Sequence, residues 1–377
     1  MSTTRLTVLT GPTVPLPAPP LLLENLERVE VSTSDSARSG FQLGFAAGRA
    51  GRAGAMDFPL LSLPLLKPFH RVVLLITFDG RPSVLLDGIV THRELTPGTT
   101  PGSTRLTVTG EDVSVMMRLE EKCVEHPAQS EPVVAQKLIL SYARYGMVPV
   151  VVPPPVLDVP LPVERVPLQR GTDLDHLTGT AARFGYVFYV TPGPAPLTNT
   201  AYWGPPVRAG LPQPALSVDM GAQTNVTSLT FRNNATTPTR VVGTVQDRTT
   251  GRAVPVRSTG SLRPPLSAAP DWQAHAGNLR TTLLRDGGTS TAGALARAQG
   301  DADASGDSVT ATGSLDTLRY GHLLAARRLV GLRGAGWLHD GLYYVREVTH
   351  LITRESYVQS FTLTRDGVGA TVTVVPT

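Results

Sequence analysis

The sequence predicts an α+β protein that is mainly β, with two similar β regions on either side of a smaller mixed α/β region. Three observations support this prediction. Runs of alternating apolar and polar residues, typical of strands, fill both ends of the chain. The two convincing helical patterns both lie in the middle of the chain. A short pattern of strand and turn residues occurs once in each β region.

Length and composition set the number of domains. The chain has 377 residues, of which 41% are hydrophobic, enough to form two or three cores. We expect an N-terminal arm and a first β domain at 1–115, a mixed α/β domain at 116–215 and a second β domain at 216–377. The last of these carries a long excursion near 255–307 that is rich in Ser, Ala, Gly and Pro.

Charge, hydropathy and cysteine content exclude several classes of protein. The net charge is only +4 and the arginines are scattered among acids, which disfavours nucleic-acid binding. The longest apolar runs, such as 72–76, are too short to span a membrane, and the N-terminus lacks the features of a signal peptide. The single Cys123 excludes an internal disulfide and is expected to be a buried thiol in a reducing compartment. We therefore expect a soluble, cytoplasmic chain.

The first β region follows an extended N-terminal arm rich in Pro and Thr. Two strands are expected within Leu26–Phe45, separated by Ser34-Asp35-Ser36. Asp79-Gly80, between two apolar runs, is a strong hairpin signal because Gly takes a positive φ at little cost. Further strands are expected at 72–78, 83–90 and 106–109.

The middle region is predicted to contain two helices. The first, near 131–145, ends at Gly146, the residue type preferred after a helix. The second, near 173–184, follows a capping box that begins at Thr172, and it ends at Gly185. Strands around these helices make the region mixed α/β.

The second β region contains most of the remaining strands. By propensity alone, 322–330 also fits a helix. The excursion is expected to lie on the surface with one Ala-rich helix at 291–299, after a turn at Thr249-Thr250-Gly251. The expected strands are 226–232, 240–246, 309–313, 328–333, 342–352 and 357–364.

The chain shows no catalytic or metal-binding pattern, and we predict no catalytic, cofactor-binding or metal-binding residues. The histidines form no His-x-His or His-Glu-x-x-His pair, and Cys123 has no second cysteine with which to bind zinc. Gly331-Leu-Arg-Gly-Ala-Gly336 departs from the dinucleotide-binding fingerprint. The histidines are His70, His92, His126, His176, His275, His322, His339 and His350.

Several residues have both a structural and a functional interpretation. Asp173 and Asp175 resemble a carboxylate pair, but acids are also favoured at a helix start, where free N–H groups meet them. Glu111-Asp112 is expected to end a strand. Trp203 fits either a packed turn or a sugar-stacking platform. His350, in an alternating strand, fits a structural residue better than a ligand.

A short pattern occurs in both β regions and predicts two copies of one β module. Each copy has Asp-Gly, a strand with Val-Thr-His, a turn, and an alternating strand that ends near an acid. The first copy is Asp87-Gly88, Val90-Thr91-His92 and 106–112, and the second is Asp340-Gly341, Val348-Thr349-His350 and 361–366.

The most specific pattern in the chain is Gln169-Arg-Gly-Thr-Asp173-Leu-Asp-His-Leu177, which leads into Ala181-Ala-Arg-Phe-Gly185-Tyr-Val-Phe. Further segments of this series are Pro132–Gly146, Tyr202-Trp-Gly-Pro, Val245-Gln-Asp-Arg-Thr-Thr-Gly251 and 340–363. Together they resemble the tail hub family of contractile injection machines. This family includes the late control protein D group of phages and the N-terminal part of VgrG spikes. The resemblance covers most of Leu26 to Arg365.

The resemblance implies two similar tube-like β-barrel domains that flank the α/β domain. It also implies a homotrimer, whose pseudo-sixfold ring joins a sixfold inner tube to a threefold spike. The implied partners are the chain itself, the inner tube protein, the spike protein and other baseplate components. Neither nucleic acid, a cofactor nor, in the resting particle, a membrane is expected. The protein would be a non-enzymatic part of a phage tail or injection particle, assembled in the bacterial cytoplasm.

One segment departs from the family pattern, and one alternative function stays open. Leu324-Ala-Ala-Arg327 stands where many relatives have Leu-x-Pro-Gly, which puts the start of the strand at 328–333 in question. The chain ends at Thr377 without a needle, so we expect the spike to be a separate protein. The alternative is a tail component that degrades or binds cell-wall glycan. Degradation would need two separated carboxylates, and binding would need Trp203, Trp272 or Trp337.

Overall fold

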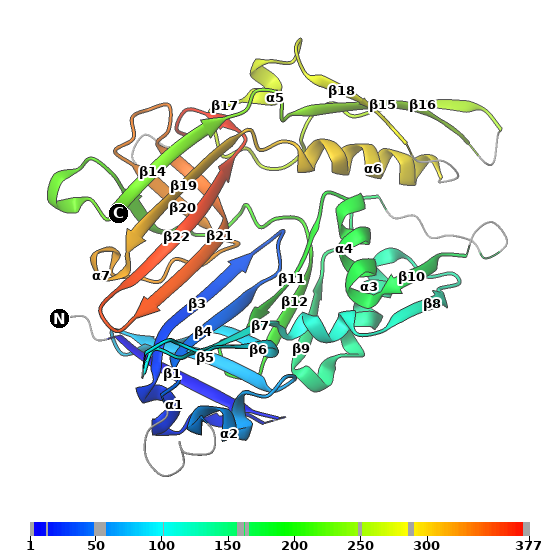
Figure 1. Ribbon diagram of the computed structural model, residues 1–377. Coiled ribbons are helices and arrows are strands. Elements are labelled where there is room, and N and C mark those ends of the chain that lie inside the picture. Colours follow the sequence, from blue (N-terminus) through cyan, green and yellow to red (C-terminus); the bar gives the residue numbers. More distant parts are fainter. Residues whose placement is uncertain are drawn as a thin grey trace.

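The computed structural model shows an α+β fold that is mainly β, as predicted (Figure 1). It describes residues 4–12, 14–48, 58–100, 102–156, 162, 166–247, 251–285 and 290–371. In these ranges no helix is long and apolar enough to cross a bilayer.

A single 13-stranded sheet runs through both ends of the chain. Its strands carry the alternating apolar residues of the sequence, so that one face is buried in the core. From the N-terminus the strands are β1 (Thr4–Gly11), β2 (Leu16–Pro17), β3 (Leu26–Ser34), β4 (Gly40–Ala46), β5 (Arg71–Phe78), β6 (Arg81–Thr96), β7 (Arg105–Asp112), β13 (Gln213–Ser217), β14 (Val226–Asn233), β19 (Val309–Asp316), β20 (Leu329–Arg333), β21 (Gly341–Thr353) and β22 (Tyr357–Arg365).

The sheet consists of two groups of strands with the same spatial order. The first group has the spatial order β1-β5-β6-β7-β4-β3, and the second has β13-β20-β21-β22-β19-β14. Each strand of one group has its counterpart at the same place along the chain in the other. Neighbouring strands are antiparallel throughout, except that β13 pairs with β20 in parallel. The predicted internal repeat is therefore present in the strand order.

The two groups also agree in register. Paired residues run Val31, Phe41, Gly110, Val90 across the first group and Phe231, Ala311, Leu363, Val345 across the second. Bulges fall at the same places: after Leu26 and Val226, and after Val90 and Val345.

This register corrects the repeat predicted from the sequence. Val90 to His92 correspond to Val345 to Glu347, so the match with Val348-Thr349-His350 was on the right strands but wrong by three positions. The reason is physical: ladder pairing and bulges set which residues are equivalent, and three similar letters do not.

The middle region contains the two predicted helices, packed on small sheets. Gly146 takes φ 77° after the 3-10 turn that follows the first helix, and the Thr172 side chain accepts a hydrogen bond from the backbone N–H of Asp175. The predicted start of the second helix is therefore confirmed. The first helix is shorter than predicted: it ends at Leu140, and a separate 3-10 turn, Ala143–Tyr145, reaches Gly146. The elements are η3 (Val113–Arg118), β8 (Glu121–Glu125), α3 (Glu131–Leu140), η4 (Ala143–Tyr145), β9 (Met147–Val151), β10 (Leu168–Thr172), α4 (Asp173–Arg183), β11 (Val187–Pro192) and β12 (Asn199–Gly204).

The excursion near 255–307 is more ordered than the sequence predicts. It joins β14 to β19, where the first group has only a short turn, and it lies at the top of Figure 1. Val241, Val245 and Val256 pack on Ala294 and Ala298 to form a separate core. The predicted turn at 249–251 lies largely outside the described residues. The elements are β15 (Thr239–Gln246), β16 (Ala253–Arg257), β17 (Ala269–Pro270), α5 (Asp271–Ala274), β18 (Arg280–Leu283) and α6 (Thr291–Ala304).

Two other expectations are wrong. Part of the expected N-terminal arm is strand β1, which pairs with β5 along its whole length. Residues 322–328 form a loop because Arg327 has φ 67°, which a helix does not allow, and the Leu324 N–H bonds to the side chain of Gln359. The remaining short elements are α1 (Pro20–Glu24), α2 (Pro59–Ser62), η2 (Pro64–Leu66), η5 (Gly221–Gln223), α7 (Thr317–Tyr320) and β23 (Gly367–Val368).

Candidate functional site

The most distinctive part of the structure is the joint between the two groups of strands. The second half of β21, Glu347–Thr353, pairs antiparallel with β3 from Ser34 to Arg28. The two strands lie side by side in the centre of Figure 1 although more than half of the chain separates them in sequence. Thr349 donates a 3.2 Å hydrogen bond across the joint to the hydroxyl of Ser32. Because of this ladder, the two groups form one continuous sheet.

A buried arginine fixes one end of the joint. Arg327 lies in the loop before β20, and its guanidinium is 3.9 Å from the centre of the Tyr189 ring. Burial lowers the pKa of this guanidinium. Tyr189 and Asp112 raise the pKa and so offset part of this decrease. Its hydrogen bonds connect the second β region, to which it belongs, with the other two regions: the Ser34 carbonyl (2.6 and 3.1 Å), the Ser39 hydroxyl (2.9 Å), the Val190 carbonyl (3.0 Å) and the Thr191 hydroxyl (2.6 Å).

The positive φ of Arg327 is explained by these contacts. The resembled family pattern has Gly at this position, and only Gly adopts this backbone conformation without strain. An arginine there costs about 1 kcal/mol or more in backbone strain. Charge-assisted hydrogen bonds from a buried guanidinium are strong enough to offset that cost.

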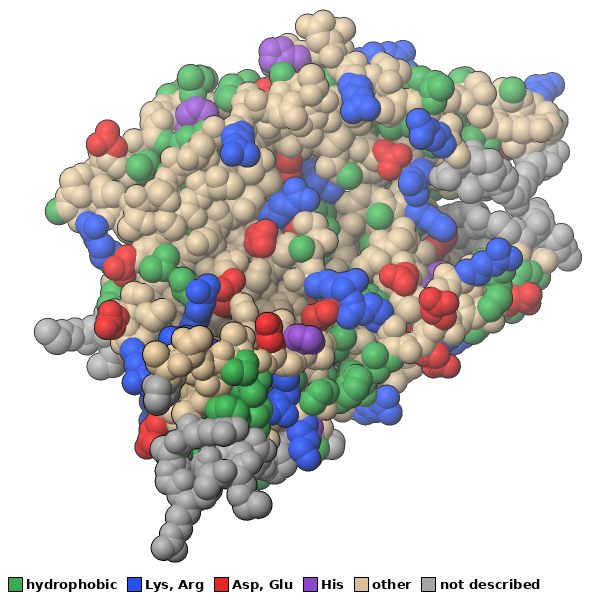
Figure 2. Space-filling model, in the orientation of Figure 1, with side chains coloured by type: hydrophobic (Ala, Val, Ile, Leu, Met, Phe, Trp, Pro, Cys, Tyr) green, Lys and Arg blue, Asp and Glu red, His purple; other side chains and the backbone are tan. Residues whose placement is uncertain are grey.

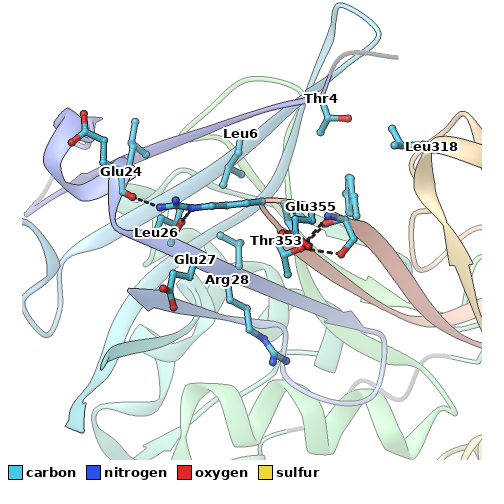
Figure 3. A pocket seen from close by; sticks show the side chains of 15 residues that line it. Thr4, Leu6, Glu24, Leu26, Glu27, Arg28, Leu318, Thr353 and Glu355 are labelled. Carbon is cyan, nitrogen blue, oxygen red and sulfur yellow. Dashed lines mark hydrogen bonds between the residues drawn. The ribbon is translucent and has the colours of Figure 1, made fainter. Parts of the chain in front are cut away.

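A cavity lies at the other end of the joint (Figure 3). It has a volume of about 650 Å³ between β1, the start of β3 and the turn from β21 to β22. Arg354 lines it and donates to the carbonyls of Glu24 and Leu26. The side chain of Thr353 is 2.9 Å from that of Ser356 in the same turn. The bonds of Arg354 join the turn of the second group to the end of α1 and the start of β3.

His350 lies within the joint, and its surroundings are structural. It is buried between β3 and β22, and its Nδ1 is 2.9 Å from the Tyr357 hydroxyl. Burial lowers its pKa to about 4. His92 is exposed instead, because the bulge after Val90 reverses which side chains of β6 face the core. The two histidines are therefore not counterparts.

The acids that begin the second helix of the middle region support the fold. Asp173 is buried and accepts hydrogen bonds from Lys122 Nζ (2.6 Å), the Tyr142 hydroxyl (2.7 Å) and Gln169 Nε2 (2.6 Å). Burial raises the pKa of Asp173, but these three hydrogen bonds outweigh it, and the net pKa is lowered. The Asp175 backbone is bonded by Thr172. The structural interpretation of this acid pair fits these contacts.

Other residues singled out in the sequence have no common site. Trp203 is fully buried and donates to the Leu177 carbonyl at 3.1 Å, so its ring offers no face to a sugar, whereas Trp337 is 64% exposed. Gly331 lies inside β20, and the segment after β20 leads into strand β21. Cys123 is exposed, not buried as expected, because β8 pairs only with β10. The described residues contain no cluster of three metal-ligating side chains.

Neither a protein-family model nor a curated protein matches the chain. Among solved structures, it is similar to a tail protein from Neisseria meningitidis MC58, with 14% identity, TM-score 0.62 and coverage of 97% of this chain and 98% of the other. It is also similar to a 43 kDa tail protein of prophage MuSo2 from Shewanella oneidensis, with 13% identity, TM-score 0.60 and coverage of 97% of this chain and 99% of the other. A third similar structure is the E. coli c3393 protein, with 12% identity, TM-score 0.52 and coverage of 90% of this chain and 73% of the other. That protein is described as a component of the type VI secretion system with structural similarity to T4 bacteriophage tail proteins gp27 and gp5. The chain therefore shares its fold with proteins of phage tails and of type VI secretion.

Proposed function

We propose that this chain is a structural hub of a contractile phage tail or of a related injection particle. The observation that carries the proposal is the single sheet made of two equivalent groups of strands joined side by side through β3 and β21. A repeated module presents the same surface twice in one chain, which suits a part that must match sixfold and threefold neighbours. The shared fold with tail proteins supports the proposal.

In this proposal three chains form a ring of six similar modules. The ring docks the sixfold inner tube on one side and the threefold spike on the other, and other baseplate components bind around it. The proposed division is 1–115 and 216–377 for two β-barrel domains and 116–215 for the α/β domain. The role is non-enzymatic, needs no cofactor and involves neither nucleic acid nor, at rest, a membrane. Assembly takes place in the bacterial cytoplasm.

The test is the mass of the full-length chain in solution. Light scattering behind a sizing column, over a range of concentrations, should give three times the chain mass of 40.0 kDa. Negative-stain images should show rings with six similar lobes. A strictly monomeric protein at the highest concentration would contradict the proposal. Release of soluble sugar from purified peptidoglycan would instead favour the glycan-degrading alternative, and saturable binding to glycan through the exposed Trp337 would favour the glycan-binding one.

A further inference from the structure

Each group of strands has an unpaired edge, within the described part of the chain, that matches one side of the joint. Strand β14 pairs with β19 on one side only. Strand β6 pairs with β5 as far as Ile89, and beyond Val90 it pairs only with β7. The outer edge of β14 and one edge of His92–Thr96 therefore offer free N–H and C=O groups, which in proteins are usually paired or covered.

These two edges are the counterparts of the two edges that form the joint. Strand β14 occupies in the second group the place that β3 occupies in the first. The second half of β6, beyond its bulge, corresponds in the same way to the second half of β21. The joint inside the chain pairs β3 with β21. The edges of their counterparts, β14 and the second half of β6, therefore stay unpaired within the described residues.

We propose that β14 of one copy pairs antiparallel with His92–Thr96 of the next copy and repeats the β3–β21 joint between chains. The contact is head-to-tail, because different surfaces meet, and such contacts close into a ring when the rotation allows it. This inference rests on the proposed ring assembly and names the strands that build it.

The equivalence between the two groups also sets the register. In the joint, Thr349 is opposite Ser32 and His350 is opposite Val31. The counterparts of the first pair are Glu94 and Arg232, and those of the second are Leu95 and Phe231, as the matched ladders and bulges require. Backbone pairing alone sets this register, and the register places an acid opposite a base and an apolar residue opposite an aromatic one.

The surroundings of these side chains agree with this register. Glu94 and Arg232 are exposed, and neither has an ion pair within the described ranges. Leu95 and Phe231 are partly buried against the cores of their own groups. Arg93, whose Nε is buried without a partner, would face the amide of Asn233.

Shifted registers are worse. A shift of one residue places either Arg93 or Leu95 opposite Arg232, which opposes two positive charges or leaves a charge facing an apolar side chain. Like charges directly opposite each other destabilise a strand pair, and a one-residue slip also turns each side chain to the other face.

Cysteine cross-linking tests the contact. All variants carry Cys123→Ser, which removes the exposed native thiol. The double variant Glu94→Cys, Arg232→Cys should form disulfides between chains, seen as covalent dimers and trimers on a non-reducing gel. The matched control Ser32→Cys, Thr349→Cys, at the counterpart positions of the internal joint, should form a disulfide without a change in mass. The shifted pair Thr96→Cys, Arg232→Cys should cross-link at least about fivefold less, since diagonal residues lie about 7–8 Å apart.

Charge reversal gives an independent measurement. Glu94→Arg and Arg232→Glu should each raise the concentration at which half of the oligomers dissociate, by about tenfold over the joints of one ring. The double variant should restore the wild-type value because the pair is only reversed. No restoration, together with trimers that lack the 94–232 cross-link while the internal control forms its disulfide, would overturn the inference and leave the proposed hub intact. A chain that stays monomeric in every variant and in the wild type would overturn both.

Discussion

Arg71 and Asp87 form a two-point ion pair that is almost completely buried, with distances of 2.7 and 2.6 Å between their nitrogen and oxygen atoms. Only 7% of the arginine side chain and 0% of the aspartate side chain are exposed. The pair also connects the first group of strands to the middle region. Arg71 donates to the Tyr145 carbonyl at 3.0 Å, and Asn199 donates to Asp87 at 3.0 Å.

Removing one partner of this pair should strongly destabilise the chain. Asp87→Asn leaves a buried guanidinium without its counter-charge, and we expect the free energy of unfolding to fall by about 3–5 kcal/mol. Chemical denaturation measures the change. The control is Glu30→Gln, which breaks an exposed pair with Arg28 and should cost less than about 1 kcal/mol. Equal effects of the two changes would show that Asp87 and Arg71 contribute no more than a surface pair.

Arg327 should not be replaceable by lysine or by glycine. Arg327→Lys keeps a charge but cannot reach the Ser34 carbonyl and the Thr191 hydroxyl together, so we expect a loss of about 2–4 kcal/mol. Arg327→Gly relieves the positive φ of this position but loses every hydrogen bond, and should also destabilise. Thermal unfolding measures both. Arg328→Lys, at the exposed neighbour, is the control and should leave the melting temperature within about 1–2 °C.

Burial of His350 should make stability depend on pH below about 6.5. Its pKa is about 4 in the folded chain against an ordinary value of 6.5, so the unfolded chain binds more protons between these values. The neutral, buried His350 makes its full contribution to the free energy of unfolding above pH 6.5, and this contribution is lost as the pH falls toward 4. From pH 7 to pH 5 this contribution falls by about 2 kcal/mol.

The variant His350→Gln isolates this effect. Its stability should fall less than that of the wild type between pH 7 and pH 5, as measured by denaturant titration at each pH. His92→Gln, at an exposed histidine of β6, should leave the wild-type dependence unchanged. Parallel curves for the wild type and His350→Gln would mean that His350 is protonated equally easily in both states.

Two glycines on helices should respond to alanine with opposite signs. A Cβ at Gly300 on α6 would lie 2.5 Å from the Arg183 carbonyl oxygen and 2.6 Å from the Gly185 nitrogen, where α6 meets the end of α4. We expect Gly300→Ala to destabilise by about 1–3 kcal/mol. Gly179, exposed on α4, has no atom within 4 Å of such a Cβ. Gly179→Ala should therefore stabilise by up to about 1 kcal/mol. Denaturation midpoints measure the change in stability for both variants. An unchanged midpoint for Gly300→Ala would show that α6 can shift away from the end of α4 at little cost.

The sequence predicted those elements whose signals are local. Thr172 marks the start of the second helix through its own side chain, and this prediction is confirmed. Gly146 takes the positive φ expected of it, although the first helix ends earlier, at Leu140. Asp79-Gly80 forms the expected turn, with φ of 47° and 74°. These outcomes depend on a few neighbouring residues, so a single sequence is sufficient to predict them.

The sequence could not predict which arginines would be buried. Arg71 and Arg327 have no local pattern that separates them from the exposed arginines. Their partners, Asp87 and Ser34 among them, come from other elements of the fold. The exposed state of Cys123 likewise depends on β8 having a single neighbouring strand.

By itself, the sequence determined that the chain is mainly β, where most strands and both middle helices lie, and that a β module occurs twice. Only the tertiary structure decided the register of the two modules. A shared place in the ladder makes Val90 the counterpart of Val345, although the letters around His350 favoured a match three residues further on. The physical reason is that equivalence in a sheet depends on hydrogen-bonded pairs and bulges formed between distant segments, whereas periodicity and capping act within one segment.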